Sequence, residues 1–278
     1  GLLAGVFQLD GGSAWKAAQA IRIDDFDDLV AASVLCRPGP IESIGIYRRH
    51  KDDPNALALY LSQFSPAAAA VVADTNGVLM YQEQVMRLAR EVAGMDWQYV
   101  HKLRKGVADK LGLNPLTGDA WRTEWSTRFI EGCQNTVGMS NSEALHWWHS
   151  VETHGGYSFN KSHGVSYGIV GYWMLWLKTY WPAQFYEAFL KLESDNDFLR
   201  KRLILEFKKM GGKVYMLDPV NSRETFRSVG KDSLFGGYQD IRGMGPKTAD
   251  KVAAAGPFAD WAQLMDALPK AVAAQLNA

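Results

Sequence analysis

The sequence predicts a mainly α-helical protein with a few short β segments toward its C-terminal end. Apolar residues recur at three- and four-residue spacing in several segments, such as residues 26–34 and 85–92, and this spacing is typical of amphipathic helices. The pattern changes after Gly211, where short segments of β type follow. We therefore expect two regions, residues 1–211 and residues 212–278.

The composition excludes several classes of protein. With 278 residues and 47% hydrophobic content, the chain can bury the core of one large domain or two smaller ones. Lys plus Arg and Asp plus Glu each total 30, so any nucleic-acid-binding surface must be local. Cys36 and Cys133 are too few for a disulfide framework, which favours a reducing cytoplasm. The most apolar run, residues 164–177, is too short to cross a bilayer, so we expect no membrane contact.

The first expected elements are a short strand or extended segment over residues 5–12 and a helix over residues 13–20. Four aspartates follow within residues 24–28. Adjacent aspartates can bind magnesium, but acids are also favoured at the start of a helix, and we favour the helix start. That helix should stop at residues 37–40, where two prolines and a glycine force a turn and leave Arg37 projecting.

The middle of the chain carries a basic cluster and a group of histidines. Two helices lead into residues 103–110, where Arg104 and Lys105 are either a solvated helix face or a phosphate contact. Three histidines follow in a tryptophan-rich helical region, namely His146, His149 and His154. Two of them share a helix face, but no cysteine or acidic ligand stands at a matching spacing, so a zinc site is not favoured.

Residues 157–163 lead into a long apolar helix. Asn160 stands at the expected N-cap, so free backbone N–H groups of the first turn are expected beside Lys161 and His163. With the helix dipole these groups form a predicted anion site that suits a polyphosphate. Tyr167 lies one turn further along the same face. The alternative is an ordinary capped helix whose lysine and histidine are merely solvated.

The C-terminal region combines short β segments with a glycine turn. Three β segments are expected, over residues 213–217, 225–229 and 233–237. Gly243 and Gly245 then form a Gly-x-Gly turn into a helix that begins at Pro246, with Lys247 and Thr248 in its first turn. This is the helix-hairpin-helix pattern, in which backbone N–H groups contact nucleic-acid phosphates without reading the bases.

Together these motifs resemble one family, the C-family bacterial replicative DNA polymerases, that is, the polymerase III alpha subunit. The matching motifs occur in the family's order at residues 5–9, 37–40, 81–86, 103–105 and 159–163 and in the terminal glycine turn. The resemblance covers essentially the whole chain. It implies polymerase III alpha-type fingers followed by a small mixed region with a helix-hairpin-helix motif.

The resemblance implies two groups of binding residues. The incoming dNTP would be contacted through its phosphates and sugar by Arg37, Arg104, Lys105, Asn160, Lys161, His163 and Tyr167. Template-primer DNA would be contacted by Gly243, Gly245, Lys247 and Thr248.

The resemblance also implies that the catalytic aspartates lie outside this chain. In the family these palm residues, which bind the two Mg²⁺ ions of nucleotidyl transfer, precede the segment that corresponds to residues 5–9. We therefore expect no catalytic or metal-binding residue here and no polymerisation by this chain alone. An upstream palm segment or chain would be its partner, and a sliding clamp is a further partner to consider.

Some residues depart from the family pattern. Ala108, Asp109 and Lys110 stand where the family usually has Gly-Lys-Lys, and Asp10 replaces a glutamate, which suggests a divergent, phage-encoded version. Two other functions remain open: a nonenzymatic helix-hairpin-helix DNA-binding or scaffold protein, and a helix-hairpin-helix DNA-repair enzyme. The repair enzyme would need a lysine nucleophile or an acidic residue shortly after the hairpin, but it leaves the upstream motifs unexplained.

Overall fold

The computed structural model describes residues 2–37, 39–155 and 159–276. Helices make up most of this part of the chain, with one three-stranded sheet, which confirms the mainly α-helical prediction. The chain divides into two compact units, one of residues 8–170 and one of residues 2–7 and 171–278. The secondary structure changes from helix to strand between Lys209 and Lys213, but the two-region division at residue 211 remains a prediction.

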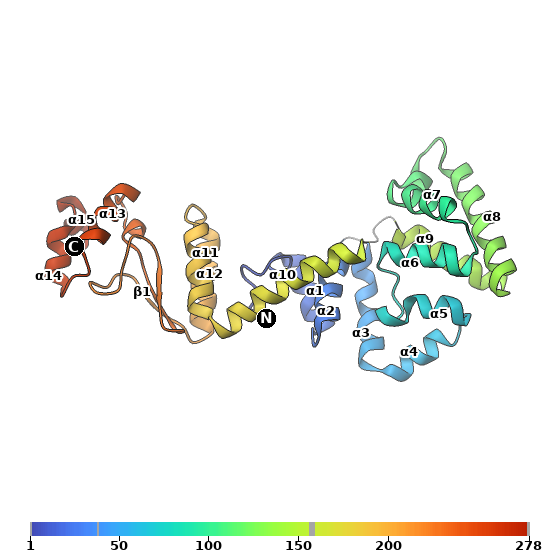
Figure 1. Ribbon diagram of the computed structural model, residues 1–278, viewed down its shortest axis with the longest axis horizontal. Helices are drawn as coiled ribbons and strands as arrows, with labels where there is room; N and C mark the ends of the chain where they lie inside the picture. Colours follow the sequence, from blue (N-terminus) through green and yellow to red (C-terminus); the bar gives the residue numbers. More distant parts are fainter. Residues whose placement is uncertain (1, 38, 156–158, 277–278) are drawn as a thin grey trace. The chain divides into compact units, whose positions relative to one another are not determined.

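The first unit is built from helices and their connections (Figure 1). In chain order these are α1 (Gly12–Ile21), α2 (Phe26–Leu35), η1 (Pro40–Ser43), α3 (Ile44–Asp52), α4 (Pro54–Leu61), α5 (Pro66–Val72), η2 (Ala73–Thr75), α6 (Gln82–Arg87), η3 (Leu88–Val92), α7 (Trp97–Ala108), η4 (Leu111–Leu113), α8 (Gly118–Val137), α9 (Asn141–Gly155) and the first half of α10 (Lys161–Tyr180). A turn of π-helix, η3, continues α6 directly.

The largest core of the first unit lies among α5 to α9, which Figure 1 shows side by side. Its centre is formed by fully buried side chains such as Leu88, Leu103, Phe129 and Trp147. These residues recur at the apolar positions of their helices, so burial of one face of each helix stabilises the group.

The aspartate-rich segment is a helix start, as predicted. The Asp25 carboxylate caps α2 by accepting the Asp28 backbone N–H (2.8 Å). Asp28 itself is buried, and its carboxylate accepts hydrogen bonds from the Tyr47 hydroxyl (3.1 Å) and from Lys51 Nζ (2.5 Å). Among the described residues no group of three or more His, Cys, Asp or Glu side chains could hold a metal ion.

Two glycines allow the first half of α10 to pack closely on α2. A Cβ atom added to Gly168 would lie 2.6 Å from Cγ2 of Val30, and one added to Gly164 would lie 3.4 Å from Cγ1 of the same residue. The first contact leaves no room for a methyl group, and the second is a close van der Waals contact. Gly168 above all therefore sets how closely the start of α10 approaches α2.

The second unit contains the rest of α10, a helical pair, a small sheet and a helical cluster. Its elements are α11 (Pro182–Leu192), α12 (Asp197–Lys209), β1 (Lys213–Tyr215), β2 (Arg227–Val229), β3 (Ser233–Phe235), η5 (Tyr238–Asp240), α13 (Pro246–Ala255), α14 (Trp261–Ala267) and α15 (Lys270–Leu276). The strand order is β1-β3-β2, with β1 parallel and β2 antiparallel to β3.

The N-terminal residues 2–7 belong to the second unit. The segment from residue 4 to residue 10 consists mainly of turns and forms no strand, although a short strand or extended segment was expected there. The backbone of Ala4 donates to the Glu206 carboxylate (3.2 Å) and accepts from the Lys178 ammonium group (2.8 Å). Lys178 and Glu206 are buried and form an ion pair, and the Tyr186 hydroxyl also donates to Glu206 (2.8 Å). These buried groups satisfy the backbone of Ala4, which has no strand partner.

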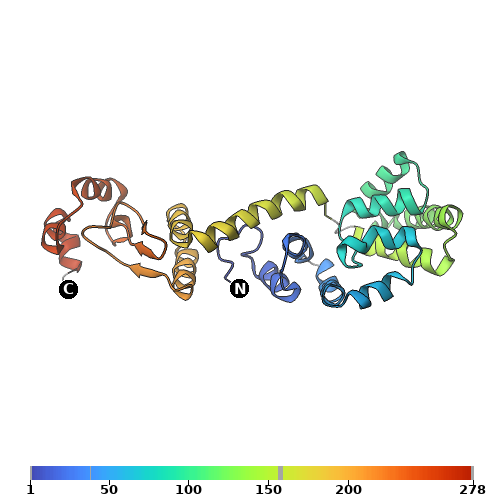
Figure 2. The same ribbon diagram turned by 60° about the horizontal axis from the view of Figure 1, so that its bottom comes forward.

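The last helices, α13 to α15, enclose their own small core (red in Figure 2). The element before the glycine turn is η5, a three-residue 3-10 helix, so the two-helix hairpin predicted here is not shown. The turn and the following helix α13 are present. Within the described ranges, no helix is long and apolar enough to cross a membrane.

Candidate phosphate-binding sites

The first turn of α10 is capped as the sequence predicts. The side-chain oxygen of Asn160 accepts the His163 backbone N–H (2.9 Å) and the Ser162 hydroxyl (2.6 Å). The Lys161 backbone N–H donates to the carboxylate of Glu83 (2.9 Å). The expectation of free N–H groups is therefore wrong for two of the first three residues of the helix. Residues 157–158 of the predicted stretch lie outside the described residues.

Backbone hydrogen bonds join the start of α10 to the start of α6. The Phe159 N–H donates to the Met80 carbonyl (3.0 Å), and the Gln82 N–H donates to the Phe159 carbonyl (2.9 Å). These bonds form an isolated parallel bridge between Tyr81 and Phe159. Two segments far apart in the sequence are thus held in register at the site.

Three consecutive side chains at the start of α6 accept hydrogen bonds from groups around the start of α10. Gln82 accepts a hydrogen bond from the Arg104 guanidinium (3.3 Å), and Glu83 accepts the Lys161 N–H. Gln84 is buried and accepts the N–H groups of the two residues before Gln82 (2.9 Å each). Arg104 therefore reaches the start of α10 indirectly, through Gln82. The motif at residues 81–86 was recognised in the sequence, but its partners Arg104 and Lys161 lie on other helices and were not predicted.

A cation and three rings stand in a series at the start of α10. The Arg37 guanidinium carbon lies 4.0 Å from the centroid of the Phe159 ring. The Phe159 and His163 centroids are 5.1 Å apart, and the His163 and Tyr167 centroids are 3.9 Å apart. Phe159 was not among the predicted site residues. His163 and Tyr167 are four residues apart on one face of α10, whereas Phe159 precedes the helix and is held beside it by its bridge to Tyr81.

Lys161 borders a polar hollow of about 340 Å³. Its ammonium nitrogen lies 5.6 Å from the centroid of the Tyr81 ring. The carboxylates of Asp27 and Asp74 also line the hollow, so it carries charges of both signs. Burial, with a contribution from Asp27 and Glu83, raises the pKa of Tyr81 to about 12.

Lys105 is the predicted residue that the structure does not connect to this group. It is exposed on α7, and its ammonium group makes no hydrogen bond or ion pair with any residue that the structure describes. The structure thus brings together Arg37, Asn160, Lys161, His163 and Tyr167 directly and Arg104 through Gln82, while Lys105 stays a prediction from the family resemblance.

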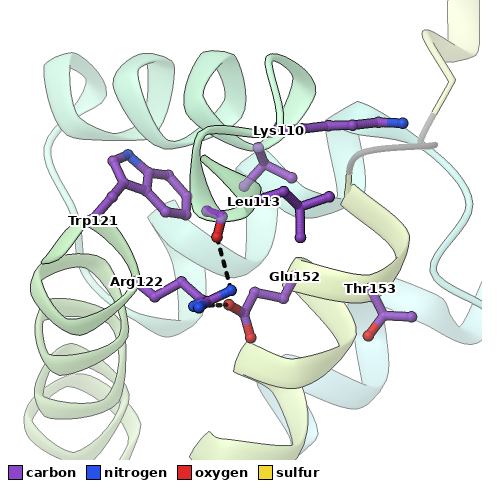
Figure 3. Close-up of a pocket in the computed structure, with 8 residues that line it drawn as sticks. Lys110, Leu113, Trp121, Arg122, Glu152 and Thr153 are labelled. Atoms are coloured by element: carbon purple, nitrogen blue, oxygen red, sulfur yellow. Dashed lines mark hydrogen bonds and ion pairs between the residues drawn. The ribbon is translucent and has the colours of Figure 1, made fainter. Parts of the chain in front are cut away.

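A second hollow, of about 250 Å³, lies where α7, η4, α8 and α9 meet (Figure 3). Trp121 and Leu113 form apolar walls, and Arg122 donates to the Gly112 carbonyl (2.7 Å) and lies 3.8 Å from the Glu152 carboxylate. Lys110, which directly follows the departures from the family pattern at Ala108 and Asp109, is at its edge. The residues that line this hollow include none of the predicted site residues.

The histidines that were considered as zinc ligands, where the structure describes them, belong to no metal-binding cluster. The His146 ring stacks on Phe64 with centroids 5.0 Å apart, and burial lowers the pKa of His146. No cluster of three metal-ligating side chains includes the described histidines. The side chain of His154 lies outside the described residues.

The glycine turn before α13 presents backbone donors to solvent. Gly243 has a positive φ of 87°, and the turn is closed by a hydrogen bond from the Met244 N–H to the Ile241 carbonyl (3.0 Å). Met244 is buried in the core of α13 to α15, while Gly243, Gly245 and Lys247 are exposed. In the part of the chain that the structure describes, the backbone N–H groups of these three exposed residues have no acceptor. Exposed N–H groups at a helix start suit an anion.

Comparisons with known proteins identify relatives of one kind. Residues 1–115 match the family model of the bacterial DNA polymerase III alpha subunit finger domain. DNA polymerase III subunit alpha of Aquifex aeolicus (strain VF5) is 31% identical over 252 residues, which are 90% of this chain and 20% of that relative. The same subunit of Treponema pallidum (strain Nichols) is 29% identical over 273 residues, 97% of this chain and 22% of the relative. The chain spans about a fifth of the length of these curated relatives.

Proposed function

Because this chain belongs to the family of the bacterial DNA polymerase III alpha subunits, with a finger domain over residues 1–115, we propose that it binds the incoming dNTP and template-primer DNA as part of a replicative DNA-directed DNA polymerase. The observation that carries the proposal is the series of Arg37, Phe159, His163 and Tyr167 beside Lys161. Cations and rings that are at least partly exposed at one helix start suit a triphosphate joined to a sugar and a base.

The nucleotide contact is electrostatic. The side chains of Lys161, His163, Arg37 and Arg104 hold the triphosphate and neutralise charge that develops on it during transfer. Asn160 keeps the first turn of α10 in place through its cap. Lys105 joins this set on the strength of the family resemblance.

The DNA contact lies at the glycine turn before α13. The exposed N–H groups of Gly243, Gly245 and Lys247 and the side chains of Lys247 and Thr248 contact the phosphates of the duplex. Such contacts fix register and affinity but carry no sequence information. Nucleic-acid affinity of this kind decreases as salt rises.

Catalysis needs groups beyond those that the structure describes in this chain. Two Mg²⁺ ions would neutralise charge on the attacking and leaving oxygens, and the described residues provide no carboxylate cluster to hold them. We assign the Mg²⁺ ligands to a palm segment or chain outside this sequence, so that the 278 residues alone do not polymerise DNA. A sliding clamp, a cytoplasmic location and a phage origin are further expectations of the same proposal.

The substitution Lys161→Ala tests the nucleotide site. It should weaken binding of a dNTP by roughly 10- to 100-fold, because a charge-assisted contact to phosphate is lost, and leave duplex affinity unchanged. Isothermal titration with dATP and fluorescence anisotropy with a labelled primer-template measure the two affinities. Lys102→Ala, an exposed lysine on α7, is the matched control.

Equal losses of dNTP and duplex affinity would contradict the assignment. A duplex affinity that falls with salt, together with no dNTP binding by the unmodified chain, would instead favour the nonenzymatic DNA-binding protein.

A further inference from the structure

Glu83 places a carboxylate at the position where the proposed triphosphate would meet α10. Its Oε2 atom accepts the backbone N–H of Lys161, the first residue of the helix, at 2.9 Å. An N–H group at this position has no partner within the helix and normally binds a side chain, water or a ligand. Here an anionic side chain of the protein itself occupies it.

The carboxylate lies among groups that attract anions. The carboxylate accepts a hydrogen bond at the positive end of the α10 dipole. The Arg104 guanidinium donates to the neighbouring Gln82, and the Lys161 ammonium nitrogen lies 5.6 Å from the ring centroid of Tyr81, two residues before Glu83. Glu83 is half-buried and close enough to Tyr81 to contribute to the raised pKa of its hydroxyl. A second negative charge brought to the start of α10 must therefore compete with Glu83.

From this geometry we propose that Glu83 is a positioning residue that acts as an internal counter-anion: it occupies the Lys161 N–H in the absence of nucleotide and yields it to a phosphate group of the incoming triphosphate. This inference rests on the proposed nucleotide-binding function. It assigns Glu83 a negative effect on triphosphate affinity, whereas a merely structural hydrogen bond would have no such effect.

The charge of Glu83 can be separated from its hydrogen bond. Glu83→Gln keeps an oxygen that accepts the Lys161 N–H but removes the negative charge, and Glu83→Ala removes both. Glu91→Gln is the matched control, because Glu91 lies further along the same helical run and pairs with exposed Arg87 (3.1 Å). Thermal unfolding checks that each variant keeps its fold.

The probe is inorganic tripolyphosphate without magnesium, followed by dATP with and without Mg²⁺, titrated into the full 278-residue chain by calorimetry. Glu83→Gln should bind tripolyphosphate roughly three- to tenfold more tightly than the unmodified chain, as expected when a carboxylate no longer competes at a helix start. Glu91→Gln should bind it with unchanged affinity.

Two results would overturn the inference while leaving the proposed function intact. One is a Glu83→Gln affinity equal to that of the unmodified chain, which would make Glu83 a structural acceptor only. The other is that Glu83→Gln binds dATP more weakly than the unmodified chain only when Mg²⁺ is present, which would make the carboxylate a metal ligand. If neither the unmodified chain nor any variant binds tripolyphosphate or dATP, the proposed function itself is wrong.

Discussion

Asp28 is a buried carboxylate whose charge is balanced inside the first unit. Lys51 Nζ lies 2.5 Å from one of its oxygens, and the Tyr47 hydroxyl donates to the other. Burial, together with the nearby charge and hydrogen bond of Asp28, raises the pKa of Tyr47. The sequence predicted the helix start at Asp25 because capping is a local interaction. It could not predict the burial of Asp28, because its partners lie 19 and 23 residues away on α3.

Asp28→Asn should destabilise the fold by about 3 kcal/mol, because it removes the buried carboxylate partner of Lys51 and leaves this lysine only the exposed carboxylate of Asp24 and backbone carbonyls such as that of Ile21 as described partners. Urea unfolding followed by circular dichroism measures the change. Asp52→Asn removes an exposed carboxylate that pairs with Arg48 and should cost less than about 1 kcal/mol. Similar losses in both variants would show that the charge balance of Asp28 has no special role.

The start of α10 shows which features of an element a sequence reveals. The Asn160 cap was predicted, since the capping residue and the backbone N–H that donates to its side chain are three positions apart. The contact of Glu83 with the same helix joins residues 78 positions apart, and no local pattern contains it. The close approach of α10 to α2 could not be predicted from the sequence either. The glycines at residues 164 and 168 allow it, but they face Val30, which is more than 130 positions away in the sequence.

Gly168→Ala should destabilise the first unit by about 1–3 kcal/mol, since the added methyl group would lie 2.6 Å from the Val30 side chain. Gly45→Ala is the matched control. Gly45 also lies within a helix, α3, but an added Cβ there meets no atom within 4 Å, so alanine should stabilise by up to about 1 kcal/mol. Differential scanning calorimetry of both variants measures the effects, and a fall in stability for both would contradict the packing argument.

On the scale of the whole molecule, the two proposed binding groups belong to different compact units. The nucleotide group lies within residues 8–170 and the DNA group within residues 171–278. Composition and periodicity predicted the helical fold class, and ordered motifs indicated the family that the comparisons support. The division between the units was not predicted, because it falls inside α10, where the helical pattern runs on without a break.

The central claim is that the start of α10 binds the triphosphate of a dNTP. It is tested most directly by the backbone amide resonances of the isotope-labelled chain during titration with dATP. The account predicts saturable shifts at residues 159–167, at Gln82 and Glu83, and at Arg37, without changes at residues 243–248. Shifts confined to residues 243–248, or none at residues 159–167 when dATP binding is saturated, would contradict it.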